Sequence, residues 1–313
     1  MKRTVTGLLL ALLLGAAAVG LAVFRTPKSC SKVIPVMGTI CELHLELENG
    51  DPDTALKAVN SAFADVMQLA NLYNPGSELA QLNASAADAP FVCSKELYSL
   101  LKESRNAYQL SAGSFDISVK PLMDLWGFYR KQGKIPPEQD IRSAKQLCGL
   151  NKVIFDDAKR TVRFPVAGMA LDLGGIAKGY ALDLAVERLH ERNVTIKRGT
   201  INLGGNICLL GKKQSYRIGI KDPSDPEKVK DVIELTSPGA VSSSGDYERF
   251  VTLEGKKFGH IMEPSSGTPA LRDYAATVFA RRGTDSDWMS TTLYLKGKSF
   301  ASKLDCLSWI VEK

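Results

Sequence analysis

A glycine-rich stretch from Leu171 to Asp183 combines residue types that bind phosphate groups. Asp172 stands between two leucines, and two glycines, Lys178 and a third glycine follow it. Glycine lets a backbone approach a ligand closely because it lacks a Cβ atom, and a helix N-terminus offers N–H groups to an anion. The stretch therefore predicts a strand, a tight turn and a helix start that form an anion or nucleotide site. A turn whose glycines serve only close packing is the alternative.

A second group of polar residues lies near the C-terminus, where Asp287 and Thr291 are four residues apart in a predicted helix. That spacing places both side chains on one face of the helix. A carboxylate and a hydroxyl are hard oxygen ligands that suit Mg²⁺, which completes its octahedral shell with water and substrate phosphate oxygens. The pair indicates a magnesium site. The alternative is a helix acid beside a threonine that bonds back to its own helix.

The elements that must position these groups show both helix and strand periodicities. Amphipathic helices are expected over 55–72 and 95–111, and a terminal helix over 285–295. Extended or strand segments are expected over 33–47, 115–119, 153–155, 161–164, 201–203, 207–210, 216–220, 232–235, 240–242, 250–253, 257–261 and 275–280. Mixed helices and strands with many late hairpins predict an α+β fold.

The net charge of +6 is concentrated at the N-terminus. Four basic residues precede residue 30, so residues 30–313 carry only about +2, too little for a nucleic-acid-binding surface. Lys2 and Arg3 precede an uncharged run from Thr4 to Phe24, a pattern typical of an export signal that is also long enough for a membrane anchor. We expect residues 1–29 to be a signal peptide or anchor, residues 30–313 to form one domain, and the protein to be extracytoplasmic, in the periplasm or at the cell surface.

Eight motif blocks occur in order along the chain. They are Met37-Gly38-Thr39, Tyr73 with Ser77-Glu78-Leu79, Gly113 to Ser118, Asp172 to Ala181, Asn202 to Asn206, Ser244 to Tyr247, His260 to Gly267 and Asp287 to Thr291. This series closely resembles the ApbE family, the FAD:protein FMN transferases, over about residues 33 to 300. Glu263 departs from the pattern, since the family usually has aspartate there.

The resemblance implies an ApbE-like fold of two T-fold-like halves with the FAD site between them. It also implies an enzyme that uses Mg²⁺ to move FMN from FAD to a threonine or serine hydroxyl of an acceptor flavoprotein, an electron-transfer subunit, and releases AMP. By resemblance, Asp287, Thr291 and the Gly175 carbonyl would ligate Mg²⁺. The positions expected to contact FAD are Met37, Tyr73, Ser114, Phe115, Asp116, Asp172, Lys178, Met262 and Ser290.

The negative charge of the FAD pyrophosphate must be neutralised before a hydroxyl can attack it, and Mg²⁺ and Lys178 would do this. The attacking hydroxyl needs a base, and His260 is a candidate because an ordinary imidazole has a pKa near 6.5. A role for His260 as phosphate ligand or ring-stacking partner is the alternative, as is Asp287 as the base. Two other activities are left open: hydrolysis of FAD to FMN and AMP, and FAD binding without catalysis.

Overall fold

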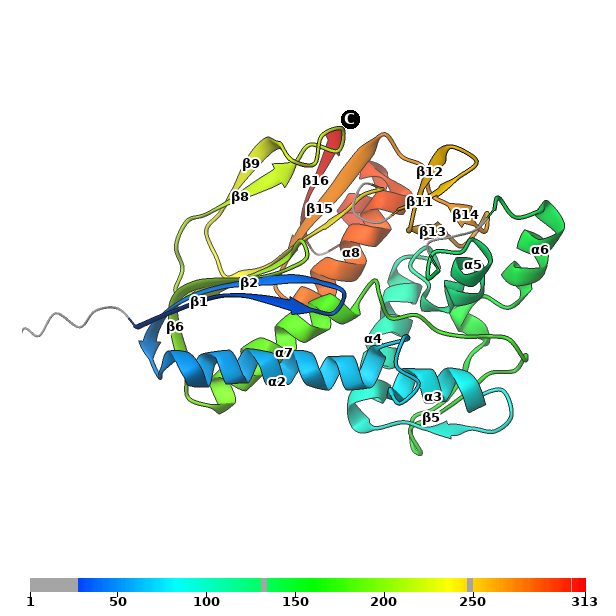
Figure 1. The fold of residues 1–313 in the computed structure, drawn as a ribbon, viewed down its shortest axis with the longest axis horizontal. Helices are drawn as coiled ribbons and strands as arrows, with labels where there is room; N and C mark the ends of the chain where they lie inside the picture. Colours follow the sequence, from blue (N-terminus) through cyan, green and yellow to red (C-terminus); the bar gives the residue numbers. More distant parts are fainter. Residues whose placement is uncertain (1–27, 131–133, 247–249, 305) are drawn as a thin grey trace, which may run out of the picture.

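The computed structural model describes residues 28–130, 134–246, 250–304 and 306–313, which fold around one antiparallel sheet (Figure 1). The strand order is β1-β2-β6-β7-β10-β15-β16. The strands are β1 (Lys28–Val36), β2 (Thr39–Asn49), β6 (Thr195–Leu203), β7 (Asn206–Gly211), β10 (Gly239–Ser244), β15 (Tyr274–Ala280) and β16 (Leu307–Glu312). Alternate residues of β2, such as Leu43 and Leu45, are buried, so one face of the sheet is apolar.

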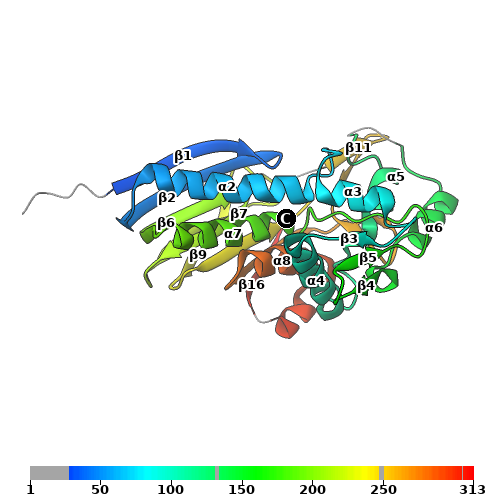
Figure 2. The same cartoon turned by 90° about the horizontal axis from the view of Figure 1, so that it is seen from below.

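Three helices cover this face: α2 (Pro52–Ala70), α7 (Ala177–Glu191) and α8 (Gly283–Lys296). Figure 2 shows α2 and α7 side by side beneath the sheet. The buried side of α2 carries Val59, Phe63 and Val66 at helical spacing, which supplies the apolar stripe such packing needs. The hairpin of β8 (Tyr216–Lys221) and β9 (Val229–Leu235) has its own apolar cluster with residues of β7, β10 and β16.

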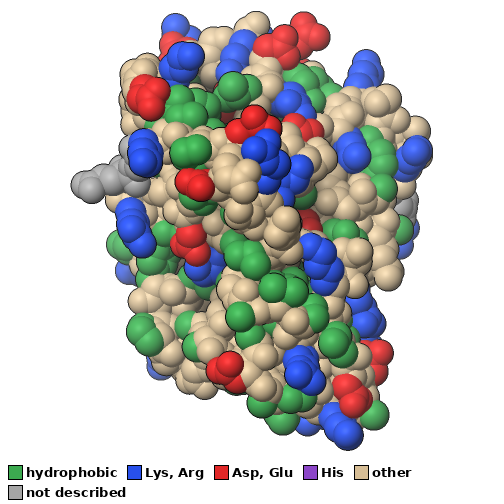
Figure 3. Space-filling model, turned by 90° about the vertical axis from the view of Figure 1, so that its right-hand side faces the viewer, with side chains coloured by type: hydrophobic (Ala, Val, Ile, Leu, Met, Phe, Trp, Pro, Cys, Tyr) green, Lys and Arg blue, Asp and Glu red, His purple; other side chains and the backbone are tan. Residues whose placement is uncertain are grey.

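The remaining elements form the end of the molecule at the right of Figure 1. They are α3 (Glu78–Ser85), β3 (Phe91–Val92), α4 (Lys95–Leu110), α5 (Lys120–Leu125), α6 (Glu138–Gln146), β4 (Ile154–Asp156), β5 (Thr161–Arg163), β11 (Phe250–Leu253), β12 (Lys256–Gly259), β13 (Met262–Glu263) and β14 (Thr268–Pro269), with 3-10 turns at Ile117–Val119 and Leu150–Lys152. A further 3-10 turn, Lys298–Lys303, follows α8 and packs against it. Acidic, basic and apolar side chains are interspersed on this end (Figure 3).

The α+β class is confirmed. The two expected halves correspond to β1-β2-β6-β7 with α2 and α7, and to β10-β15-β16 with α8. They share one sheet because Ala240 of β10 pairs with Cys208 of β7. The described chain begins at Lys28, already in β1, and residues 1–27, which carry the predicted signal or anchor, lie outside the described residues. Of the helices in the described part, none is long and apolar enough to span a membrane.

Two sequence predictions of local structure are wrong. Leu171–Leu173 is a loop, and residues 117–119 form a 3-10 turn instead of an extended segment. The Leu171 loop is held by a side chain: Asn83 accepts from the Leu171 N–H (2.8 Å) and donates to its carbonyl (2.9 Å). The amide thus supplies the bonds that a neighbouring strand would have supplied.

Candidate functional site

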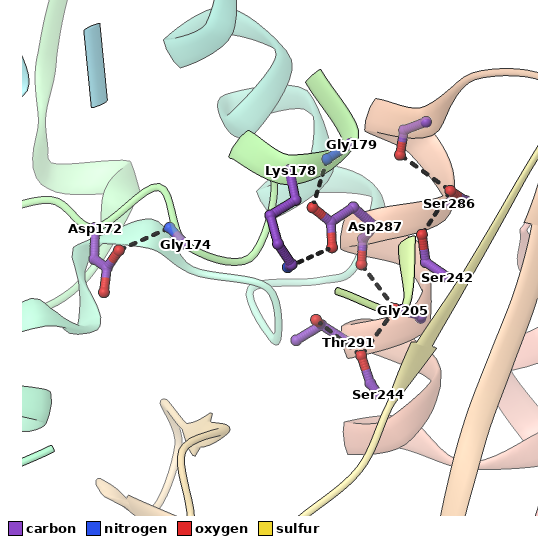
Figure 4. A network of polar contacts seen from close by, with 12 residues as sticks. Asp172, Gly174, Lys178, Gly179, Gly205, Ser242, Ser244, Ser286, Asp287 and Thr291 are labelled. Atoms are coloured by element: carbon purple, nitrogen blue, oxygen red, sulfur yellow. Dashed lines mark hydrogen bonds and ion pairs between the residues drawn. The ribbon is translucent and has the colours of Figure 1, made fainter. Parts of the chain in front are cut away.

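Asp287 is the buried carboxylate around which the site is arranged (Figure 4). It projects from the second turn of α8 toward the N-terminus of α7. Gly179 N donates to Oδ2 at 2.9 Å, and Lys178 Nζ lies 3.5 Å from Oδ1. Both predicted groups, the glycine-rich turn and the C-terminal pair, therefore meet at one point, although the chain separates them by more than one hundred residues.

Asn206, at the start of β7, joins this network. Its side-chain amide, oriented by the surrounding donors and acceptors, donates to Asp287 Oδ1 (3.2 Å) and accepts from Lys178 Nζ (3.0 Å). Burial raises the pKa of Asp287, whereas Lys178, the Gly179 N–H and Asn206 oppose that rise. A carboxylate so buried is costly to ionise without a cation beside it. Lys178 is that cation within the described chain.

The Thr291 hydroxyl behaves differently from its neighbours on α8. Ser286, Ser290 and Thr292 each donate to a carbonyl of their own helix, at Gly283, Asp287 and Trp288. Within the described chain, Thr291 makes no such bond. The hydrogen-bonding contact of its hydroxyl there is with Ser244 Oγ, at 3.4 Å. A threonine that bonds back to its helix was the alternative to a metal ligand, and the geometry contradicts it.

Gly175 lies beside this hydroxyl. A Cβ atom at Gly175 would stand 4.0 Å from Thr291 Oγ1 and 3.1 Å from Phe115 Cε2. Phe115 in turn packs against Trp288, with ring centroids 6.2 Å apart. The three expected magnesium ligands, the Asp287 carboxylate, the Thr291 hydroxyl and the Gly175 backbone, thus come from two neighbouring segments and offer only hard oxygen donors, which suits Mg²⁺.

The donor set is sparse. Within the described part of the chain, no group of three or more His, Cys, Asp or Glu side chains is placed to hold a metal ion. Magnesium tolerates such a sparse site because it keeps several waters and uses substrate phosphate oxygens. A zinc-type site, which needs a closed set of nitrogen and sulfur ligands, does not match these residues.

Helix α8 begins without a side-chain cap of its own, and Asp183 of α7 takes that role. Its carboxylate accepts from Gly283 N (2.6 Å), Thr284 N (2.9 Å) and Thr284 Oγ1 (2.5 Å). These bonds satisfy N–H groups that a helix start leaves unpaired. Because Asp287 lies one turn further along α8, Asp183 also sets where the site carboxylate stands.

We expect Asp183→Ala to lower the free energy of unfolding by about 2 kcal/mol, because it removes a cap and leaves the buried Thr284 hydroxyl without its partner. Urea denaturation monitored by circular dichroism measures this. Asp65→Ala is the matched control: Asp65 pairs with Arg188 across α2 and α7 at 3.3 Å, but 54% of its side chain is exposed, so about 0–1 kcal/mol should be lost. Equal losses in both variants would refute the capping role.

Asp172 is held in a second group next to the glycine turn. Its Oδ1 accepts from Gly174 N (2.7 Å), and its Oδ2 accepts from the Tyr129 hydroxyl (2.5 Å). Burial and the Asp172 carboxylate raise the pKa of Tyr129 well above its ordinary value, so this hydroxyl stays a donor. Tyr73 packs edge-on against Tyr129 at 6.2 Å and is 74% exposed, which leaves its ring available to a flat ligand.

Four other predicted FAD contacts have partners within the protein. The buried Asp116 carboxylate accepts from Ser118 N (2.8 Å) and Leu150 N (3.3 Å), and its pKa is raised by burial. Ser114 donates to the Ser111 carbonyl (2.9 Å), and Ser290 donates to the Asp287 carbonyl (2.9 Å). Met262 is buried in the smaller core of α5 and α6. Asp116 therefore shapes the loop before α5, whatever further contact it makes.

Met37 and His260 lie in two further segments of the fold. Met37 is half-buried, with φ = 51°, in the tight turn between β1 and β2. The half-buried His260 follows β12 directly. The backbone at Gly259 lies against Asp246, since a Cβ there would stand 2.9 Å from Asp246 Cα. Asp246 comes two residues after Ser244, so the His260 block packs next to the segment that touches Thr291. Tyr247, part of one motif block, lies outside the described residues.

Two hollows of the described chain lie away from Asp287. A groove of about 470 Å³ lies between α2, α3, the start of α4 and α7, and includes Tyr180 and Arg188. None of the predicted site residues lines it. A small cavity of about 70 Å³ does include Ser114, together with Glu263 and Lys296. Asp287, Lys178 and Thr291 line neither of these two cavities.

Fold and site together define an α+β protein with a buried carboxylate and a lysine where two helices meet. The chain belongs to the ApbE family, whose model matches residues 37–305. Two relatives named FAD:protein FMN transferase are similar to it. The one from Treponema pallidum is 29% identical, over 84% of this chain and 77% of its own. The one from Klebsiella pneumoniae is 32% identical, over 70% and 68%.

Two solved structures support the same assignment. The ApbE protein of Thermotoga maritima superposes with a TM-score of 0.83 at 30% identity, covering 91% of this chain and 94% of that chain. The flavinyl transferase ApbE of Pseudomonas stutzeri, in its apo form, gives 0.80 at 25% identity, with 92% of each chain covered. The family resemblance deduced from the motif blocks is confirmed.

Sequence reasoning did not assign roles to Asn206, Ser244, Asp183 and Tyr129. The first two stand inside motif blocks, and Asp183 ends the glycine-rich stretch. Their positions in the sequence could therefore have marked them as candidate site residues. Their hydrogen-bond partners could not be predicted, because each contact joins residues far apart in the sequence. Tyr129 belongs to no block, and only the fold brings it to Asp172.

Proposed function

We propose that this protein is an FAD:protein FMN transferase that uses Mg²⁺ and modifies a threonine or serine hydroxyl of an acceptor protein. Membership of the ApbE family and the names of its relatives support flavin transfer. The single observation that carries the metal requirement is the junction of α7 and α8. There a buried carboxylate and a hydroxyl without a bond to its own helix stand together beside Lys178.

The reaction is a phosphoryl transfer. The acceptor hydroxyl oxygen bonds to the phosphorus of the FMN phosphate, the bond from that phosphorus to the bridging oxygen breaks, and AMP leaves with that oxygen. The hydroxyl proton passes to a base, for which His260 is the candidate. Asp287, Thr291 and the Gly175 carbonyl would hold Mg²⁺, which supplies charge neutralisation at the pyrophosphate.

The chain's own residues prepare this site before substrate arrives. Gly179 N and Asn206 hold the Asp287 carboxylate in one orientation. Lys178 compensates part of its charge and is 20% exposed, so its ammonium can also reach a phosphate oxygen. Tyr129 fixes Asp172 at the turn before α7. Such preorganisation avoids reorganisation during the reaction, which is the main source of electrostatic catalysis.

The protein would act outside the cytoplasm, on an exported electron-transfer flavoprotein. The basic start and apolar run of residues 1–24 support this location, either as a cleaved signal or as a membrane anchor. Fractionation of cells that express the full chain, with and without residues 1–27, tests it. Recovery of the full chain in the cytoplasmic fraction would contradict the proposal.

One assay tests the activity. The chain from residue 28 is incubated with FAD, Mg²⁺ and a candidate acceptor domain that exposes a serine- and threonine-containing segment. Intact mass, AMP and free FMN are then measured. We expect an FMN adduct on the acceptor and an equal amount of AMP, both abolished by EDTA. The matched control is the acceptor with its modified residue replaced by alanine.

The other outcomes separate the alternatives. AMP and free FMN in equal amounts, without an adduct on any acceptor, would show hydrolysis of FAD. Bound FAD that stays intact with Mg²⁺ and several acceptors would show a binding protein. Adduct formation in EDTA would overturn the metal requirement alone.

A further inference from the structure

Three hydroxyl groups between β10 and α8 form a continuous chain that ends at the site. Thr291 Oγ1 lies 3.4 Å from Ser244 Oγ, and Ser244 Oγ lies 2.8 Å from Ser290 Oγ. Ser290 Oγ then donates to the Asp287 carbonyl at 2.9 Å. Ser244 is the last residue of β10, an interior strand of the sheet, so the hydroxyl chain joins the sheet to Ser290 and Thr291 of α8. Figure 4 shows Ser244 next to Thr291.

Proton counting fixes the direction of this chain. A hydroxyl carries one proton, and a carbonyl can only accept, so Ser290 uses its proton on Asp287. Ser290 therefore accepts from Ser244, and this contact consumes the only proton of Ser244. Toward Thr291, Ser244 presents nothing but lone pairs. The Thr291 hydroxyl must then be the donor in its contact with Ser244.

We propose that Ser244 and Ser290 are positioning residues that turn the Thr291 proton away from the cation site. This inference rests on the proposed function, since it concerns the same Mg²⁺. A hydroxyl that ligates a cation offers a lone pair to the metal and must place its proton on another acceptor. Ser244 is that acceptor, and the chain leaves the lone pairs of Thr291 to face Asp287 and Gly175.

Because the hydroxyl chain is buried, the loss of either serine hydroxyl should disturb the orientation of the Thr291 hydroxyl. Ser244 and Ser290 are 8% and 1% exposed, so water does not easily replace either hydroxyl. The contact between Ser244 and Thr291 is the longest of the three and hence the weakest. Groups that orient metal ligands in this way typically change metal affinity by about 10- to 100-fold when removed.

The experiment titrates the protein with Mn²⁺, an octahedral oxygen-seeking ion whose free form gives an EPR signal. We expect Ser244→Ala to weaken Mn²⁺ binding about tenfold, and Ser244→Thr, which keeps the hydroxyl, to restore it. Ser290→Ala should also weaken binding, because Ser244 is then free to donate to Thr291. The matched control is Ser243→Ala on the same strand, whose hydroxyl contacts Thr277 at 2.8 Å and not α8; it should bind as the parent does.

Each outcome decides a different claim. Mn²⁺ binding by Ser244→Ala and Ser290→Ala equal to the parent would overturn the positioning role while leaving the metal site intact. Failure of the parent protein to bind Mn²⁺ would overturn the metal site and the metal part of the proposed function. In turnover, the Mg²⁺ concentration for half-maximal rate should rise in Ser244→Ala while KM for FAD stays constant. A rise in KM for FAD alone would also refute the proposal.

Discussion

Replacing Asp287 by asparagine should lower the rate of FMN transfer roughly 10³-fold, the scale expected when one preorganised electrostatic group is lost. The substitution keeps the shape of the side chain, so Gly179 N retains an oxygen to which it can donate. What is lost is the negative charge at the centre of the cation site. Lys178 would lose the negative charge of its ion-pair partner at 3.5 Å and would then repel a divalent cation.

The rate is measured as FMN adduct formed on the acceptor at saturating FAD over a range of Mg²⁺ concentrations. Asp285→Asn is the matched control, because it makes the same chemical change two residues earlier on α8, where the carboxyl faces Arg282 and Glu103. That variant should transfer FMN at the parent rate. An Asp287→Asn protein that is as active as Asp285→Asn would remove Asp287 from the metal site.

The grouping of Asp287 with Thr291 was predictable from sequence, because the two residues share one short segment. Asp287 and Thr291 lie one helical turn apart, so their helix alone places them on one face. The glycine-rich turn before α7 was recognisable for a similar local reason: Ala181, Ala185 and Leu189 continue it with helical spacing and are buried as expected. Local periodicity thus identified the two segments that the fold brings together at Asp287.

The supporting contacts were not predictable, because they depend on which segments the fold brings together. Leu171 and Leu173 are fully buried on either side of Asp172, and this alternation imitates a strand. The backbone there is nevertheless held by Asn83, 88 residues away in the chain. In the same way, nothing near Asp183 in the sequence indicates that its carboxylate caps α8.

The segment 115–119 shows how one side chain overrides a pattern. Phe115, Ile117 and Val119 alternate with polar residues as in a strand. Asp116, however, accepts from Ser118 N and Ser118 Oγ (2.6 Å), which closes a turn and starts the 3-10 helix. Aspartate favours such local bonds over sheet pairing. The same carboxylate was expected to contact FAD, and that expectation stays a prediction.

Gly179→Ala should be the most damaging single-methyl change in the protein's site. In an ordinary helix, alanine at this position would be favourable by about 1 kcal/mol. Here α7 and α8 meet backbone to backbone: a Cβ on Gly179 would stand 2.1 Å from the Gly283 carbonyl oxygen and 2.8 Å from Asp287 Cβ. Neither atom belongs to a flexible side-chain end, so the helices must separate.

We expect this overpacking to cost about 3 kcal/mol of the free energy of unfolding, with a fall in Tm of roughly 5–10 °C. Transfer should also fall when it is assayed well below the new Tm, because separating the helices breaks the bond from Gly179 N to Asp287. Gly76→Ala is the matched control, since its Cβ would approach only the Asn74 side chain, at 3.2 Å. Equal thermal stability of the two variants would show that the close contact of α7 and α8 does not position the site.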